Sequence, residues 1–224
     1  AIAPFFLGAQ DLDQLQEEIE DAMSKKEWKE ASEQIEYCLN HYDLDELTRA
    51  GLTHNLGFCL LEQQDFIGSK YYLQNALQFK YSLHNEKNGD YAKTAQLLGD
   101  LSLQIGHFDQ AERYFLEAQF LYNQFLGARS DENVDALVSL GQYAEVVGDF
   151  EGAHMYFDSA LEISRSIHHA QSPEFANVNN HIGRVYVKNR DLQNAEKFLL
   201  RANGIYHDLG KEYTLDYIES LENL

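Results

Sequence analysis

The chain has few basic residues, very little cysteine or proline, and no long apolar run. Its 224 residues include 17 lysines and arginines against 37 aspartates and glutamates, a net charge of −20. A charge of this size repels phosphate backbones and anionic lipid, which argues against nucleic acid as a partner and favours basic partners. The apolar runs are far shorter than the roughly 20 residues that a membrane helix needs, so no membrane insertion is expected.

The sequence also lacks the residue patterns that carry chemistry. Cys38 and Cys59 both fall on apolar helical positions, so we expect reduced core thiols in a cytoplasmic protein. None of the nine histidines stands in a metal-binding pattern such as His-Glu-x-x-His, and there is no glycine-rich phosphate loop or nucleophile elbow. We therefore predict no catalytic residue, no metal, no cofactor and no enzymatic activity.

The feature that is present is a period of 42 residues. With 14 glycines in 224 residues, three further glycines at successive steps of 42 residues from a first one would arise by chance about once in four thousand trials. Small or apolar residues recur 12, 16 and 19 positions after each of these glycines. The in-phase sets are Gly57, Gly99, Gly141 and Gly183; Ser69, Ala111, Ala153 and Ala195; Leu73, Phe115, Phe157 and Leu199; Ala76, Ala118, Ala160 and Ala202.

This period predicts helical hairpins. A glycine inside a helix costs about 1 kcal/mol relative to alanine, so its recurrence indicates close approach of the paired helices. Asp65, Asp149 and Asp191 stand at the turn of three hairpins, where a carboxylate caps the second helix by accepting from its free N–H groups. His107 breaks this pattern in the remaining repeat, and Asp109 is the expected substitute cap.

The expected fold is all-α, a right-handed solenoid of stacked antiparallel helix pairs. Residues 11–46 carry 13 acidic and 3 basic side chains and are expected to form an acidic first hairpin. The remaining predicted parts are an N-terminal extension over 1–10, four repeat units over 47–89, 90–131, 132–173 and 174–210, and a capping or incomplete helix over 211–224.

The pattern resembles the tetratricopeptide repeat (TPR), whose first helix carries a small residue at position 8 and whose second helix carries small residues at positions 20 and 27. The period of 42 residues is similar to that of the longer repeats of kinesin light chains. The resemblance implies a concave groove, lined by first helices, that holds a partner's peptide. Carried over residue by residue, it implies a peptide-binding set of Asn177, Asn180, Arg184, Lys188, Gln142, Lys93, Gln96, Phe58 and Leu61, with Phe58 and Leu61 expected to be exposed.

Two interpretations of the cations in this set remain open. Arg184 and Lys188 lie four residues apart on one helix, where both can reach one carboxylate of a ligand. Alternatively, they pair with acidic residues of neighbouring helices and form an ion network between repeats without any ligand. The acidic candidates for that network are Glu145, Glu219 and Glu222.

The predicted function is a non-catalytic adaptor or scaffold that binds a short peptide segment of a protein partner. The alternative is a structural scaffold whose groove is filled by another part of its own chain or by a second copy. In the second case the protein would be a homo-oligomer. A peptide-sensing regulator is the third interpretation.

Overall fold

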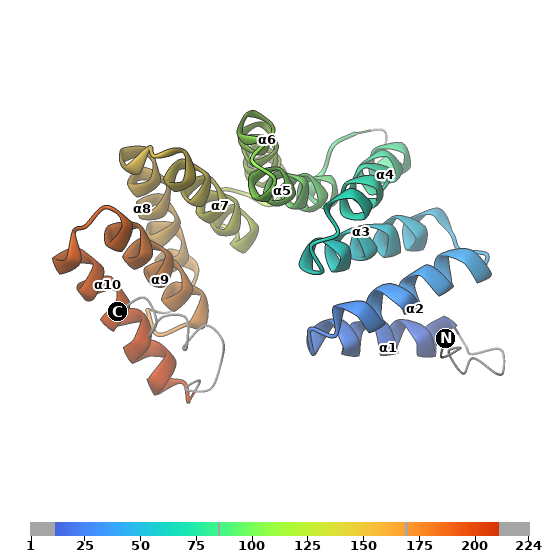
Figure 1. The fold of residues 1–224 in the computed structure, drawn as a ribbon, viewed down its shortest axis with the longest axis horizontal. Coiled ribbons are helices and arrows are strands. Elements are labelled where there is room, and N and C mark those ends of the chain that lie inside the picture. The colour runs from blue at the N-terminus through green and yellow to red at the C-terminus, as the bar shows by residue number, and fades with distance from the viewer. Residues whose placement is uncertain (1–11, 85, 169, 211–224) are drawn as a thin grey trace. The chain divides into compact units, whose positions relative to one another are not determined.

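The computed structural model describes residues 12–84, 86–168 and 170–210. Within these residues the chain forms ten helices and no strand, and the helices follow one another as five hairpins (Figure 1). Their bounds are α1 Leu12–Ser24, α2 Trp28–His41, α3 Glu46–Glu62, α4 Phe66–His84, α5 Gly89–Gln104, α6 Phe108–Phe125, α7 Asp131–Val147, α8 Phe150–Ile167, α9 Pro173–Lys188 and α10 Leu192–Asp208.

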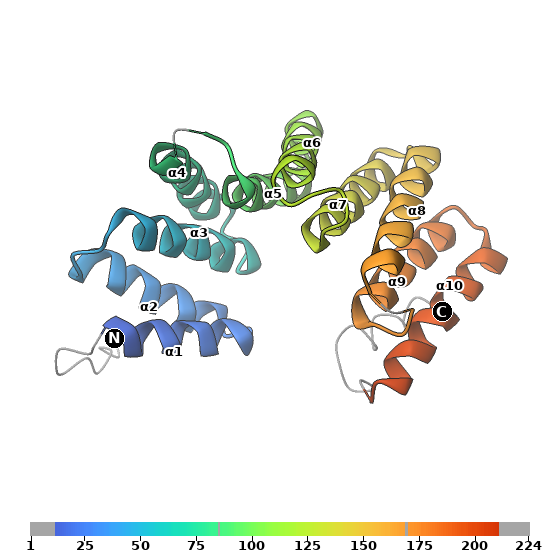
Figure 2. The same cartoon turned by 180° about the vertical axis from the view of Figure 1, so that it is seen from behind.

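The helices belong to two compact units, which divide at Leu101 near the end of α5. In the first unit, α1 packs on α2, α2 on α3 and α3 on α4. In the second unit, α6 packs on α7, α7 on α8, α8 on α9 and α9 on α10 (Figures 1 and 2). Packing of consecutive helix pairs is the arrangement of an all-α solenoid, as predicted. The right hand of the superhelix stays a prediction.

The hairpins agree with the predicted repeat ranges to within a residue at the start of each pair. Helices α5, α7 and α9 each begin one residue before the ranges 90–131, 132–173 and 174–210. The assignment of these ranges as separate repeat units stays a prediction. The extension over 1–10 and the helix expected over 211–224 lie outside the described residues.

Three of the four repeated glycines, Gly57, Gly141 and Gly183, each lie against the side chain that follows 16 residues later. A Cβ placed on Gly57 would lie 2.6 Å from Leu73 Cγ, and a Cβ on Gly183 would lie 2.5 Å from Leu199 Cγ. At Gly141 the same atom would lie 2.7 Å from the Phe157 ring. The in-phase glycines and their in-phase apolar partners are therefore the two sides of one contact between the helices of a hairpin.

The turns within the hairpins share one backbone conformation. Each contains a residue with a positive φ angle just before the second helix, and in three of the five turns this residue is not glycine. The five are Lys26, Gln64, Gly106, Gly148 and Arg190. The turn thus imposes the same left-handed conformation whether or not the local sequence favours it.

The predicted aspartate caps are confirmed. Asp149 Oδ1 accepts from the Gly152 N–H at 2.9 Å, and Asp65 and Asp191 make the corresponding bonds at the start of α4 and α10. The N-cap of α6 is His107, and its side chain makes no capping hydrogen bond. The expectation that Asp109 would substitute is wrong, because this residue already lies within the first turn of α6, past the cap position.

Candidate functional site

Two polar contacts join the first helices α7 and α9 in the second unit. Gln142 Nε2 lies 3.1 Å from His181 Nδ1, and Glu145 forms an ion pair with Lys188. On α9, Arg184 lies three residues after His181 and four before Lys188, so the three share one stripe of the helix. We call the surface formed by Gln142, Glu145, Val146, His181, Arg184, Val187 and Lys188 the α7–α9 face.

The ion pair of the α7–α9 face is strongly asymmetric in its exposure. The side chain of Glu145 is 6% exposed, whereas that of Lys188 is 53% exposed. A carboxylate so deeply buried needs a cation to offset its lost hydration. For Lys188, the structure therefore supports the ion network between repeats, with Glu145 as the partner. Glu219 and Glu222 lie outside the described residues.

Arg184 belongs to the α7–α9 face in a different way. It is half-buried beside His181, and burial together with the Arg184 charge lowers the pKa of that imidazole to about 4. His181 is therefore neutral near neutral pH, and its Nδ1 accepts the hydrogen bond from the Gln142 amide. Its ring also stacks on Phe157, with the ring centroids 6.3 Å apart.

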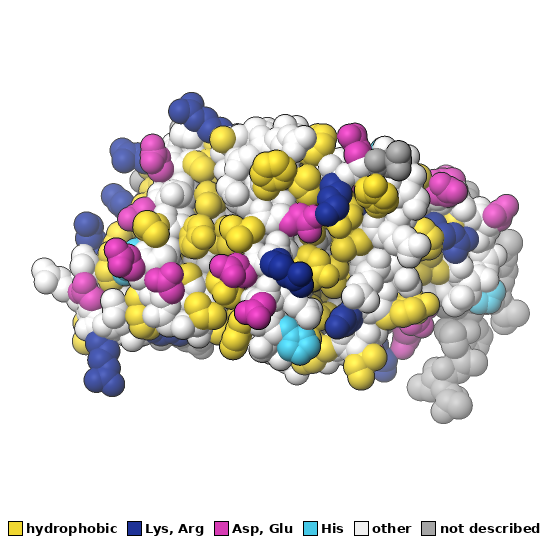
Figure 3. Space-filling view, turned by 90° about the horizontal axis from the view of Figure 1, so that it is seen from above, with side chains coloured by type: hydrophobic (Ala, Val, Ile, Leu, Met, Phe, Trp, Pro, Cys, Tyr) yellow, Lys and Arg dark blue, Asp and Glu magenta, His cyan; other side chains and the backbone are white. Residues whose placement is uncertain are grey.

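Exposed apolar side chains accompany these polar groups. Val146 on α7 is 51% exposed and Val187 on α9 is 37% exposed. Apolar side chains also reach the surface between charged ones on the side of the molecule drawn in Figure 3. The α7–α9 face thus combines hydrogen-bonding groups, cationic groups and exposed valines.

The remaining predicted residues of the second unit differ in accessibility. Asn177 is exposed on α9, one turn before His181. Asn180 is 2% exposed and already takes part in a contact within the protein. A peptide on the surface therefore has direct access to Asn177 but not to Asn180.

In the first unit the predicted residues lie on α3 and α5. Lys93 is exposed and Gln96 is half-buried, and both take part in contacts within the protein. Phe58 is half-buried, with its ring 5.3 Å from that of Trp28 in an edge-to-face arrangement. Leu61 is 3% exposed, so the expectation that it lies on the surface is wrong: this position packs into the hairpin instead.

A buried basic pair lies behind Lys93. His54 Nδ1 lies 2.9 Å from Thr94 Oγ1, and Lys80 Nζ donates to the Asp90 carbonyl at 3.1 Å. Burial, followed by the charges of Lys80 and Lys93, lowers the pKa of His54 to about 3. Burial also lowers the pKa of Lys80 to about 8, although the nearby Asp90 carboxylate acts to raise it.

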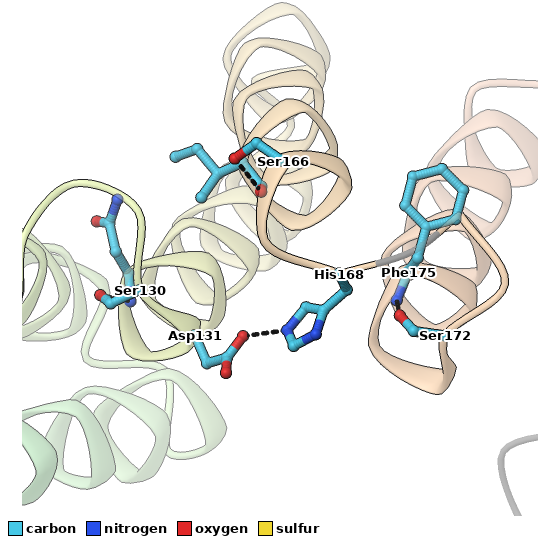
Figure 4. Close-up of polar contacts among 8 residues, drawn as sticks. Ser130, Asp131, Ser166, His168, Ser172 and Phe175 are labelled. Carbon is cyan, nitrogen blue, oxygen red and sulfur yellow. Dashed lines mark hydrogen bonds and ion pairs between the residues drawn. The ribbon is translucent and has the colours of Figure 1, made fainter.

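The opposite, N-terminal ends of α7 and α9 are acidic. Figure 4 shows His168, just after α8, pointing at the Asp131 carboxylate at the start of α7, and the two side chains are in contact. Desolvation, and then the carboxylates of Asp131, Glu132 and Glu174, raise the pKa of Asp135 to about 6. Both first helices are therefore acidic at their N-terminal ends, and α9 carries cations towards its C-terminal end.

The predicted peptide-binding set did not include His181. His181 falls at a position that the family pattern does not assign to the groove. A usable signal was nevertheless present, because the contacts that join α7 and α9 pair residues separated by 39 and 43 positions, close to one period. Polar residues at nearly one period apart therefore indicate contacts between neighbouring first helices.

Two searches of the described residues gave negative results. They contain no group of three or more histidine, cysteine or acidic side chains arranged to hold a metal ion. None of the helices found among them is long and apolar enough to cross a membrane.

Comparison with known proteins first identified one repeat. A family model described as a tetratricopeptide repeat matches residues 176–209, which include most of α9 and all of α10. No curated protein sequence matches the chain significantly.

Solved structures resemble the chain over most of its length. BtubC (BKLC) from P. vanneervenii superposes with a TM-score of 0.73 at 19% identity, covering 91% of this chain and 82% of that one. The TPR-like repeats of a putative kinesin light chain from Podosopora anserina give 0.71 at 13% identity, covering 89% and 96%. The Rap conjugation gene regulator of plasmid pLS20, in complex with the Phr* peptide, gives 0.71 at 15% identity, covering 99% and 68%.

At these identities the structural likeness shows the fold, and the family model identifies one repeat, at residues 176–209. The helix pairs, their glycine contacts and their 42-residue period agree with both findings. The chain thus contains a tetratricopeptide repeat over residues 176–209, within a fold that it shares with TPR-like repeat proteins.

Proposed function

We propose that this protein is a non-catalytic interaction module that binds a short segment of a partner protein on the α7–α9 face. The observation that carries the proposal is the row formed by the Gln142–His181 contact, Arg184 and the Lys188–Glu145 pair, with exposed Val146 and Val187 beside it. The Rap regulator in complex with the Phr* peptide supports it, since a protein of the same fold there holds a peptide.

The distribution of charge suggests how the segment lies. Arg184 and the exposed part of Lys188 favour an acidic group of the ligand at the C-terminal ends of α7 and α9. Asp135 and the carboxylates around it favour a basic group at the N-terminal ends. Asn177 is placed to bind a peptide main chain, whereas buried Asn180 supports the face from behind.

The first-unit residues Lys93, Gln96 and Phe58 form a second candidate surface on α3 and α5. We keep them in the proposal as a separate contact surface of the first unit, and leave out Leu61 because it is buried. A basic partner segment would also suit the acidic first hairpin.

The test is selection of peptides from a displayed random library on the purified chain, followed by affinity measurement with Arg184→Ala. A charge-assisted contact is worth about 1.5 to 3 kcal/mol, so the substitution should weaken binding about tenfold to a hundredfold. Arg165→Ala, at an exposed position on α8, is the matched control and should leave the affinity unchanged.

Two outcomes contradict the proposal. One is full peptide affinity in a variant that combines Arg184→Glu with Lys188→Glu. The other is a molecular mass that doubles with concentration while no peptide is selected, which would favour the self-associating scaffold.

A further inference from the structure

A pocket of the first unit lies between α2, α3 and α4, away from the first-helix surface of the proposed function. It has a volume of about 260 Å³ and is formed by three helices, two of which are second helices of their hairpins. Its lining residues are Glu36, Leu39, Asn40, Arg49, Thr53, Tyr71, Tyr72, Asn75 and Phe79.

Three hydrogen-bond donors in this pocket have no partner among the described residues. Among the described residues, the guanidinium of Arg49 and the side-chain amides of Asn40 and Asn75 make no hydrogen bond or ion pair. Arg49 is half-buried, so its charge has lost part of its hydration without gaining an acidic partner. The Thr53 hydroxyl, in contrast, is already engaged in donating to the Arg49 carbonyl at 2.7 Å.

The repeat itself shows that the fold does not require these donors. One, two and three periods after Arg49 stand Tyr91, Asn133 and Phe175. The same steps from Asn75 lead to Glu117, Ser159 and Arg201. Residues that the helix packing requires recur with the period, as the glycines do, so the two donors serve a local purpose of this hairpin.

The rest of the lining includes two exposed aromatic side chains. Tyr71 is 61% exposed and Phe79 is 38% exposed, and both lie on the same stripe of α4 because they are eight residues apart. Leu39 adds an aliphatic surface from α2. Burial raises the pKa of Tyr72, and the Glu36 carboxylate adds to the effect, so its phenol keeps its proton.

We propose that this pocket binds the C-terminal residue of a partner protein, taking its free carboxylate on Arg49, Asn40 and Asn75 and its apolar side chain against Tyr71 and Phe79. A carboxylate is the group that a guanidinium and two amides complement best. The volume is below the 300 to 1,000 Å³ of sites for drug-sized ligands, so it suits one terminal residue. The last residue of a chain carries both a carboxylate and a side chain that can be apolar. An aspartate or glutamate supplies only the carboxylate, so a second residue would have to supply the apolar group.

The experiment uses N-acetylphenylalanine as the probe and follows the Arg49 Nε–H and the Asn40 and Asn75 amide signals by NMR on the full chain. We expect these signals to shift and saturate with N-acetylphenylalanine and not with its carboxamide. Arg49→Gln should weaken binding about tenfold or more, while Arg129→Gln, at an exposed position of the other unit, should leave it unchanged. Glu36→Gln should tighten binding, because it removes the one carboxylate of the lining.

Asn75→Asp keeps the shape of the side chain and adds a negative charge, so it should abolish binding even if Arg49→Gln fails to fold. Equal binding of the carboxamide would overturn the proposal. So would unchanged affinity in Arg49→Gln or Asn75→Asp. Inorganic phosphate that shifts the same signals as tightly as N-acetylphenylalanine would replace the chain-end assignment with a general anion site.

Discussion

At the scale of the residue, a single β-carbon distinguishes the repeated Gly57 from Gly51 of the same helix. A Cβ on Gly57 would meet Leu73 at 2.6 Å, whereas a Cβ on Gly51, six residues earlier in the same helix, would have no atom within 4 Å. We expect Gly57→Ala to destabilise the protein by about 1 to 3 kcal/mol through overpacking. Gly51→Ala should stabilise it by up to about 1 kcal/mol, since alanine is the better helix former. Urea denaturation of the two variants measures both, and equal effects would refute the contact.

We expect Lys188 to contribute to stability and Arg184 to peptide affinity, and mutation can separate the two roles. Because Lys188 pairs with the buried Glu145, Lys188→Ala should lower stability by about 1 kcal/mol, the modest value reflecting the exposure of the lysine. Glu145→Gln in the same chain should restore most of that loss, since it removes the unpaired charge. Arg184→Ala should instead act mainly on peptide affinity. Melting curves of the single and double variants test this, and the absence of coupling between Lys188 and Glu145 would speak against the pair.

Two buried histidines make stability depend on pH. Folding lowers the pKa of His54 to about 3 and of His181 to about 4, from an ordinary value of 6.5. Between pH 6.5 and about 4 the unfolded chain therefore binds more protons, so acidification through this range favours unfolding, by at most about 1.4 kcal/mol per pH unit for each histidine. Asp135 acts in the opposite sense, because its pKa is raised to about 6 and the folded state takes up its proton first.

The measurement is the unfolding free energy at pH 7 and pH 4.5. Replacing both His54 and His181 by glutamine should reduce the stability lost between pH 7 and pH 4.5, and Asp135→Asn should increase that loss. His84→Gln, at an exposed position, serves as the control and should follow the parent protein. A double variant that loses as much stability as the parent would exclude these histidines as the cause.

At the scale of the element, the start of α6 lacks the aspartate cap that the second helices α4, α8 and α10 have. His107 has φ −87° and ψ 66°, close to the −83° and 76° of the capping residue Asp149. Because the backbone is already in the capping conformation, His107→Asp should stabilise the protein by about 1 kcal/mol, and Asp149→Ala should destabilise it by a similar amount. Thermal melting of both variants checks this, and a neutral His107→Asp would show that another group already satisfies the free N–H groups of α6.

The elements also show which parts of the site could be predicted. The repeat phase predicted that Gly141 lies at a contact between paired helices, and the structure shows that the contact is with Phe157. The repeat phase did not reveal that Leu61 and Asn180 are buried, since the family's position numbers give the direction of a side chain and not what covers it. The choice of Lys188 and not Arg184 as the partner of Glu145 depends on rotamers, which a sequence does not encode.

At the scale of the whole molecule, the division into two compact units predicts uneven loss of stability. In a repeat array each helix pair interacts mainly with its neighbours, so damage spreads over a limited distance. Gly57→Ala should lower the hydrogen-exchange protection of α3 and α4 more than that of α9 and α10, and Gly183→Ala should do the reverse. Equal losses in both units for either variant would indicate one cooperative body.

The left-handed turns have a consequence for how such a protein can change over time. Lys26, Gln64 and Arg190 occupy a conformation that glycine adopts more easily, as Gly106 and Gly148 do in the equivalent turns. Substituting glycine at these three sites adjusts stability without touching the α7–α9 face or the pocket around Arg49. A lineage could therefore acquire a new binding preference through a destabilising change on its recognition surface and recover its robustness in a distant turn.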